Sequence, residues 1–153
     1  MFKSLNVIVC CDSNYGIGLN NSLPWNIKSE MKLFQNKTIG SGNNCVIMGK
    51  HTFMSIPKKH SPLKERVNCI VSSSFKNNTI KHVIRNLDTE LESFLNSTNY
   101  DTYWIIGGES IYHKIMKDKY HIINELHISV LDKSFDCDTF FPEIDTKIFK
   151  RIS

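Results

Sequence analysis

Glu30 is a carboxylate on the apolar side of a predicted helix, and its type and position make it the first candidate for chemistry. Ile27 and Phe34 lie three and four residues away, so they share its side of the helix. A buried carboxyl group resists ionisation because its charged form loses water, and such a group in a cleft is a candidate for proton transfer. An exposed helix glutamate fits the spacing equally well, so both interpretations stand on spacing alone.

The segment before Glu30, residues 16–25, has the sequence GIGLNNSLPW. Gly16 and Gly18 allow the backbone to turn tightly or to approach a ligand closely. Trp25 follows a proline in a polar loop, where a core residue is not expected. The segment therefore has the composition of a loop that could approach a ligand closely.

Three more segments follow predicted strands and could hold an anion. Residues 49–52 (GKHT) open a helix, where free backbone N–H groups and the helix dipole attract negative charge. Residues 72–74 offer three serine hydroxyls, and Gly107-Gly108 separates a strand from a helix. Arg66, just before a strand, could pair with a carboxylate through two parallel hydrogen bonds. Each segment alone also fits an ordinary turn or a surface salt bridge.

These residues must be positioned by alternating apolar strands and short amphipathic helices, which predict an α/β fold. Buried apolar strands separated by helices favour a mixed, mostly parallel central sheet with helices on both faces. Such sheets bind ligands at the carboxyl ends of their strands, where the candidate residues fall. We expect Asp88 to cap one helix and residues 12–26 to form a long loop. The predicted strands are 5–11, 45–48, 67–71, 81–84, 103–106 and 125–131, and the predicted helices are 28–36, 50–56, 88–95 and 110–116.

Length and composition exclude several other classes of protein. The 153 residues fit one domain, 1–153, and 41% hydrophobic with 22% charged residues is ordinary globular composition. A net charge of +4 from scattered basic residues is too small to indicate nucleic-acid binding. No stretch resembles a signal peptide or spans a bilayer, so we expect a cytoplasmic protein without a membrane partner. Five cysteines without CxxC spacing and six histidines without metal-ligand spacing indicate free thiols and no metal site.

Taken together, the order and spacing of five segments resemble the dihydrofolate reductase family. They span about residues 7 to 144, nearly the whole chain, and GIG-x-N-x-x-LPW followed by an acid and a phenylalanine is specific to that family. The segments are VIVCCDSNYGIGLNNSLPWNIKSEMKLF, CVIMGKHTFMSI, PLKERVNCIVSSS, WIIGGESIYHKIM and LHISVLDKSFDCDTFFPEI.

The resemblance implies a three-layer fold and the reduction of dihydrofolate by NADPH. In this family a hydride passes from the nicotinamide to pteridine C6 while N5 gains a proton. Glu30 would hold the pteridine through its N3 and 2-amino group, with water near Trp25 assisting protonation. Ser129 falls where the family usually has a threonine bonded to this carboxylate. Leu23 would close over the nicotinamide.

The resemblance also implies the walls of both ligand sites. The Ile8 and Ile106 carbonyls would face the pteridine, and Arg66 would bind the α-carboxylate of the glutamate tail. The family joins the two glycines of the pyrophosphate loop by a cis peptide. The substrate-binding residues implied are Ile8, Val9, Cys10, Met31, Phe34, Ile56, Leu63, Arg66, Ile106 and Tyr112. The cofactor-binding residues implied are Cys10, Ile17, Gly18, Gly49, Lys50, His51, Thr52, Ser72, Ser73, Ser74, Gly107, Gly108, Glu109, Ser110, Ile111 and Tyr112.

The sequence departs from the family pattern at two places. Phe53 stands where a tryptophan is usual. After DTFFPEID only TKIFKRIS remains, whereas the family continues into a hairpin whose last strand lies beside the strand that carries Ser129. We therefore expect an open sheet edge, a sheet completed otherwise, or part of a longer chain fused to thymidylate synthase.

The same residues leave two alternative functions open, and they also indicate which binding partners to expect. A related reductase of the riboflavin-pathway type shares the fold and cofactor, but Glu30 with LPW before it and Arg66 after it favour a pteridine glutamate. A non-catalytic NADPH- or folate-binding module is the second alternative, because of the missing hairpin. We expect antifolate inhibitors to bind, and a monomer unless the chain is fused to or paired with thymidylate synthase.

Overall fold

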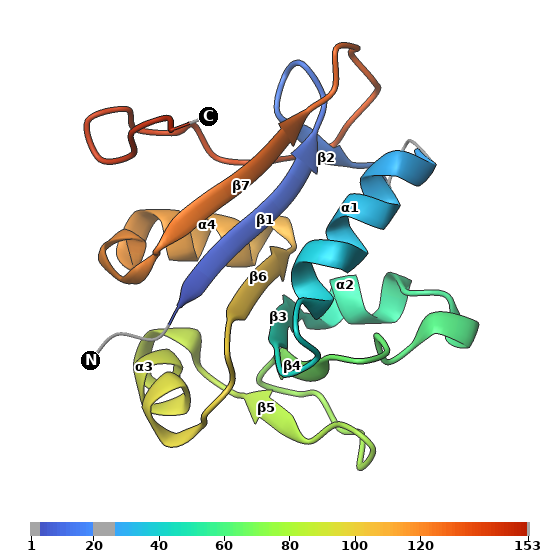
Figure 1. The fold of residues 1–153 in the computed structure, drawn as a ribbon, viewed down its shortest axis with the longest axis vertical. Coiled ribbons are helices and arrows are strands. Elements are labelled where there is room, and N and C mark those ends of the chain that lie inside the picture. Colours follow the sequence, from blue (N-terminus) through green and yellow to red (C-terminus); the bar gives the residue numbers. More distant parts are fainter. Residues whose placement is uncertain (1–3, 20–26, 153) are drawn as a thin grey trace.

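A computed structural model describes residues 4–19 and 27–152, which form a central sheet with helices on both faces (Figure 1). The strands are β1 (Leu5–Cys11), β2 (Gly16–Gly18), β3 (Cys45–Gly49), β4 (Val67–Val71), β5 (His82–Ile84), β6 (Tyr103–Gly107), β7 (Glu125–Val130) and β8 (Thr139–Phe140). The α-helices are α1 (Lys28–Ile39), α2 (Lys50–Ser55), α3 (Leu87–Ser97) and α4 (Glu109–Asp118), and short 3₁₀ helices occupy Lys58–His60 and Tyr120–Ile122.

Six of these strands form the main sheet in the order β5-β4-β3-β6-β1-β7. Each neighbouring pair runs parallel, and within the described residues antiparallel pairing is confined to the separate ribbon of β2 and β8. Short apolar runs such as LNVIVCC and VNCIV suit this architecture, because a strand covered on both faces is buried throughout. The expected α/β fold with a mostly parallel sheet is confirmed.

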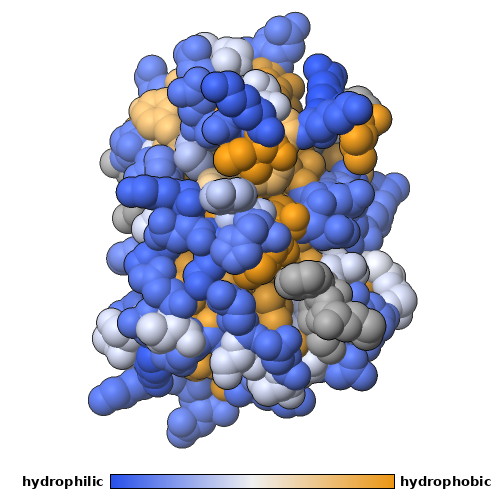
Figure 2. Space-filling model, turned by 90° about the vertical axis from the view of Figure 1, so that its left-hand side faces the viewer, coloured by the Kyte–Doolittle hydropathy of each residue, from blue (hydrophilic) through white to orange (hydrophobic). Residues whose placement is uncertain are grey.

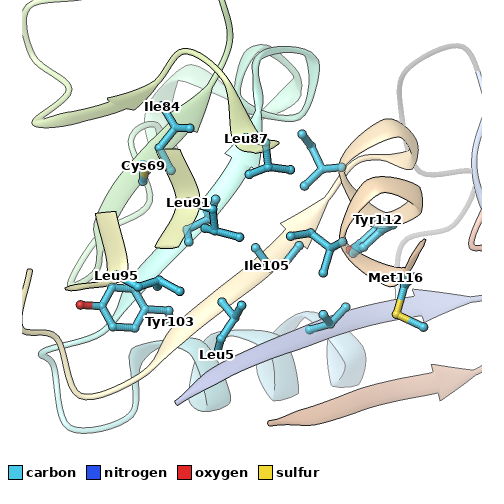
Figure 3. Close-up of a cluster of buried hydrophobic side chains, with 14 of the residues drawn as sticks. Leu5, Cys69, Ile84, Leu87, Leu91, Leu95, Tyr103, Ile105, Tyr112 and Met116 are labelled. Atoms are coloured by element: carbon cyan, nitrogen blue, oxygen red, sulfur yellow. The ribbon is translucent and has the colours of Figure 1, made fainter. Parts of the chain in front are cut away.

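The alternation of side chains along the strands creates two cores, one on each face of the sheet. On one face, Leu5 and Val7 of β1 pack against α3 and α4, and Figure 3 shows how Leu87, Leu91 and Leu95 of α3 project into this cluster. The opposite face carries a second cluster, with Phe34 of α1 and Phe53 of α2 packed on the sheet. Its strand members are Ile8, Val46, Met48, Ile70 and Trp104. The three-layer arrangement is therefore confirmed.

The boundaries differ from the sequence predictions in ways that have local causes. The predicted loop 12–26 contains β2, which becomes a strand only because distant β8 supplies its partner. Asp88 is not the N-cap of α3: that position belongs to Asn86, whose side chain accepts hydrogen bonds from the N–H groups of Asp88 and Thr89. A cap must lie just outside the helix, and α3 begins one residue before Asp88.

The sheet ends at β7, whose one strand neighbour in the described part of the chain is β1. Figure 2 looks at the molecule from the left of Figure 1, the side that carries this edge, and shows a band of apolar side chains between polar ones. Residues 141–152 contain no strand, although Ile144 and Phe149 pack against the first core cluster. In the described residues no helix is long and apolar enough to cross a membrane.

Candidate active site

The carboxyl ends of β3, β4 and β6 lie side by side, because these three strands are neighbours in the sheet. Gly49 ends β3 and leads into α2, while Gly107 ends β6 and leads through Gly108 into α4. Neither helix has a side-chain cap at its N-terminus. Their first backbone N–H groups are therefore available to an anion such as a pyrophosphate.

The glycines at these strand ends leave room that any side chain would fill. A Cβ atom on Gly107 would lie 3.2 Å from the ring of Tyr112, and the φ of Gly107 is 122°. A Cβ on Gly108 would lie 3.1 Å from Thr52 Oγ1. The peptide between the two glycines is cis, as the resemblance implies. The backbone can therefore approach a ligand closely here, which fits the dinucleotide that the sequence predicts.

A pocket of about 350 Å³ opens beside this cradle. It includes Ser72 and Ser73 after β4 and Ser110 in α4, which the sequence predicts as cofactor residues. It also includes Arg85 and Lys114, two cations that sequence reasoning missed. Arg85 directly follows β5 in the same way that Ser72 and Ser73 follow β4. This equivalent position after a strand is the sequence feature that could have identified Arg85 as a candidate.

Both cations in this pocket are oriented by neighbours. The Arg85 guanidinium donates to the Ser72 carbonyl at 3.2 Å and to the Phe75 carbonyl at 2.6 Å. Lys114 forms an ion pair with Asp88 at 2.9 Å. Among the described residues, the Ser72 and Phe75 carbonyls therefore leave other N–H donors of Arg85 unused, since a guanidinium carries five. Lys50 and His51, the cations expected at this site, are exposed at the start of α2.

Asp12, another residue that sequence reasoning missed, anchors the segment that carries Ile17 and Gly18. One carboxylate oxygen accepts from the Gly16 N–H at 2.7 Å, and the other accepts from the Phe135 N–H at 2.8 Å across the β7–β8 loop. Burial alone would raise the pKa of Asp12, but these backbone donors hold that pKa below its usual value. Asp12 is therefore a buried anion that fixes the predicted nicotinamide segment.

On the predicted substrate side, Glu30 lies half-buried in the first turn of α1, close to Cys10 near the end of β1. Burial, followed by the nearby Glu30 carboxylate, raises the pKa of the Cys10 thiol to about 12. Cys10 is the register partner of Ser129 on β7, so both residues lie on the same sheet face. The structure thus gathers three predicted site residues, while the hydrogen bond between Ser129 and Glu30 stays a prediction.

The predicted benzoyl pocket lies against the second core cluster. Val9 packs in the first cluster on the opposite face, so only its backbone can reach the ligand, and Met31 is 46% exposed. The Ile8 carbonyl accepts a hydrogen bond from the Tyr112 hydroxyl at 2.8 Å, and its second lone pair could accept from the predicted pteridine. The predicted wall residues in or against the second cluster are Ile8, Phe34, Ile56, Leu63 and Ile106.

Arg66 is held at the C-terminal end of α1. Its Nε donates to the Lys64 carbonyl at 2.8 Å and its Nη1 to Thr38 Oγ1 at 3.1 Å. Asn68 fixes the same loop, because its side chain accepts from the Leu63 N–H and donates to the Leu63 carbonyl. Thr38 and Asn68 were both missed, although Asn68 is a polar residue inside an apolar strand. Leu23 and Trp25 lie outside the described residues.

Comparison with known proteins decides which family this architecture represents. A family model described as dihydrofolate reductase matches residues 4–153. The chain belongs to the dihydrofolate reductase family. It is 38% identical to the dihydrofolate reductase of Sus scrofa, over 99% of this chain and 86% of that protein. It is 40% identical to the viral dihydrofolate reductase of Saimiriine herpesvirus 2 (strain 488), over 98% of this chain and 74% of that protein.

Membership in the dihydrofolate reductase family makes the chain an oxidoreductase that acts on dihydrofolate. A nicotinamide cofactor and the binding of antifolates go with this family. Within the described residues no group of three or more histidine, cysteine or acidic side chains could hold a metal ion.

Proposed function

We propose that the chain reduces 7,8-dihydrofolate to 5,6,7,8-tetrahydrofolate with NADPH, and that Glu30 orients the pteridine and assists protonation of N5. The observation that carries this proposal is the position of Glu30, half-buried over Cys10 at the carboxyl end of β1. A carboxylate there is partly shielded from water. It also lies near the carboxyl ends of the strands, where parallel sheets bind ligands. This product supplies one-carbon metabolism and thymidylate synthesis.

Glu30 would accept hydrogen bonds from pteridine N3 and the 2-amino group, which fixes the ring in one orientation. Orientation and proton delivery are the two contributions that the protein itself makes, and general acid assistance is worth typically about 10²- to 10⁴-fold in rate. Ser129, beside Cys10 in the sheet register, would donate its hydroxyl to the same carboxylate. Arg66 would bind the glutamate α-carboxylate, because Thr38 and the Lys64 carbonyl already hold its side chain in place.

NADPH supplies the hydride when it is bound. Its pyrophosphate would lie on the Gly107-Gly108 cradle and the N-terminus of α4, where backbone N–H groups are uncapped. Its 2′-phosphate would lie near Ser72, Ser73 and Arg85, which supports NADPH over NADH because an additional dianion favours a cationic pocket.

The test is the turnover of NADPH and dihydrofolate, followed at 340 nm, for wild type and Glu30→Gln. We expect kcat/KM to fall about 10²-fold or more, because the amide cannot carry negative charge or relay a proton. The matched control is Glu143→Gln, the same change at an exposed position in the segment after β8. Wild-type turnover that survives in Glu30→Gln would contradict the role of Glu30, and a folded wild type without any turnover would contradict the reaction.

We further propose that the chain acts as a monomer in a reducing compartment such as the cytoplasm, without a nucleic-acid or membrane partner. Five free cysteines support a reducing compartment, since none is paired. Light scattering during gel filtration measures the mass, and a species twice 17.7 kDa would contradict the monomer.

A further inference from the structure

Helix α1 is attached to the sheet by unusually little buried surface. Thr38 is the one buried residue among its twelve, and its N-cap residue Ile27 makes no side-chain cap bond. In most globular helices the packing of an apolar face supplies the stability. Polar contacts must therefore contribute much of what holds α1, and with it Glu30, in place.

A line of polar contacts joins the sheet-facing side of α1 to the edge strand β7. Glu30, Phe34 and Lys37 lie on the same side of the helix, because they are four and three residues apart. Lys37 Nζ lies 2.9 Å from His127 Nδ1, and His127 Nε2 lies 2.9 Å from Glu125 Oε1. The three side chains therefore connect the last turn of α1 to β7. We call this connection through Lys37, His127 and Glu125 the tie.

The chemistry of the partners assigns the proton on His127. A lysine ammonium has only donors, so Nδ1 must be the bare nitrogen that accepts from Lys37. A carboxylate only accepts, so Nε2 must carry the proton that is donated to Glu125. A ring with both nitrogens protonated would place an N–H against the ammonium. The tie thus requires a neutral imidazole in one tautomer.

Packing on the sheet fixes the plane of this ring. The Trp104 indole contacts the His127 ring edge to face, with centroids 5.0 Å apart. Trp104 is 5% exposed and belongs to the second core cluster, so it offers a rigid surface. The buried Trp104 indole therefore holds the His127 ring in an orientation that points Nδ1 at Lys37.

We propose that His127 is a positioning residue, which locks the last turn of α1 to β7 through Lys37 and thereby sets where Glu30 stands against Cys10 and Ser129. Ser129 lies two residues beyond His127 on the same face of β7. The tie therefore fixes the position of α1 relative to β7, the strand that carries Ser129, which is the expected hydrogen-bond partner of Glu30. Its kinetic consequences rest on the proposed role of Glu30, whereas the tie itself does not.

The first test reads the proton on His127 directly, in the wild-type chain, by long-range ¹H–¹⁵N correlation of the histidine side chains. His127→Gln identifies its signals by their disappearance. We expect a single neutral tautomer with the proton on Nε2 near neutral pH. A ring protonated on Nδ1, or on both nitrogens, would overturn the proposal, because neither can accept from Lys37.

The second test removes the partners singly and together, with Lys37→Met, His127→Leu and the double variant. We expect each single change to lower kcat/KM for dihydrofolate about fivefold and to speed amide exchange in α1, with KM for NADPH unchanged. The double variant should be no worse than either single one, because both break the same tie. Losses that multiply in the double variant would show that no tie exists.

Two further variants separate the tie from charge and general stability. Lys37→Arg keeps an N–H donor and should recover most of the lost kcat/KM. Lys32→Met removes the same charge from the exposed side of the same helix and should match the wild type. A Lys37→Met effect that Lys32→Met reproduces would overturn the proposal.

These outcomes also separate this inference from the proposed function. If the chain lacks turnover, the tautomer and the exchange of α1 amides still test the tie. If turnover depends on Glu30 while the tautomer is wrong, the positioning role fails alone.

Discussion

The two sides of the proposed active site are built by different means. The cofactor side consists of strand ends, glycines and uncapped helix N-termini, and it rests on strands that are buried almost throughout. The substrate side is α1, with one buried residue, held by side-chain hydrogen bonds at Thr38 and Lys37.

This difference predicts different responses to mutation. On the cofactor side the backbone itself is the proposed binding surface, so adding atoms should do the most damage. On the substrate side polar side chains fix the geometry, so removing donors or acceptors should alter substrate kinetics with less effect on stability. The variants below test this contrast.

The largest effect is expected for Gly107→Ala. An added Cβ would meet the Tyr112 ring at 3.2 Å at a φ of 122°, where residues other than glycine are strained. We expect the free energy of unfolding to fall by about 3 kcal/mol, with loss of NADPH binding. Gly42→Ala is the matched control, since its φ is 95° but no atom lies within 4 Å of the added Cβ. If urea unfolding showed that both variants lose the same free energy of unfolding, the close contact between Gly107 and Tyr112 would have no special effect on stability.

Asp12→Asn comes next and tests the cofactor-side segment that a buried charge holds in place. The amide keeps one acceptor but turns N–H donors toward the Phe135 N–H, so we expect a loss of about 2 kcal/mol at pH 7. Ser134→Ala, which removes the exposed hydrogen bond from Asn14 to the same loop, should cost far less.

The pH dependence of that loss has a defined sign. The pKa of Asp12 is lowered on folding, so its stabilisation is present above its unfolded pKa and disappears as pH falls through the folded one. The stabilities of wild type and Asp12→Asn, measured by urea unfolding, should therefore converge as the pH falls below about 4. A difference that stays constant on acidification would contradict the assignment.

Asn68→Ala tests the substrate side without touching a ligand-facing residue. Its side chain holds the loop from Leu63 to Arg66 through three hydrogen bonds to backbone groups. We expect KM for dihydrofolate to rise about tenfold, equivalent to one lost buried hydrogen-bonding group, with KM for NADPH unchanged. Steady-state kinetics with each substrate varied in turn would reveal the split, and equal changes in both KM values would refute it.

Arg85→Leu should give the smallest effect and concerns only the choice of cofactor. If its guanidinium faces the 2′-phosphate, affinity for NADPH should fall about fivefold to tenfold while affinity for NADH stays the same. Fluorescence titration with both cofactors measures this. An equal loss for NADPH and NADH would mean that Arg85 only supports the loop through the Ser72 and Phe75 carbonyls.

The sequence predicted the strands and helices well, because their signals are local. The apolar runs 5–11 and 103–106 were interpreted as buried strands because they are short and end at turn residues, and the structure confirms both as strands. Glycines and serines directly after such runs do lie at strand ends, whereas their role in binding a cofactor stays a prediction. The contacts of Glu30 could not be derived from spacing alone, since a helical glutamate is exposed or buried according to what packs against it.

What the sequence determined by itself was therefore the family, the order of the elements and the chemical types at the strand ends. Only the tertiary structure decided that Asp12 binds the N–H of Phe135, 123 residues away, and that Lys37 meets His127, 90 residues away. It also decided that Arg85 shares a pocket with Ser110. The physical reason is that hydrophobic periodicity depends only on residues that are close in the sequence. The partner of a polar side chain depends instead on how the sheet brings distant segments together.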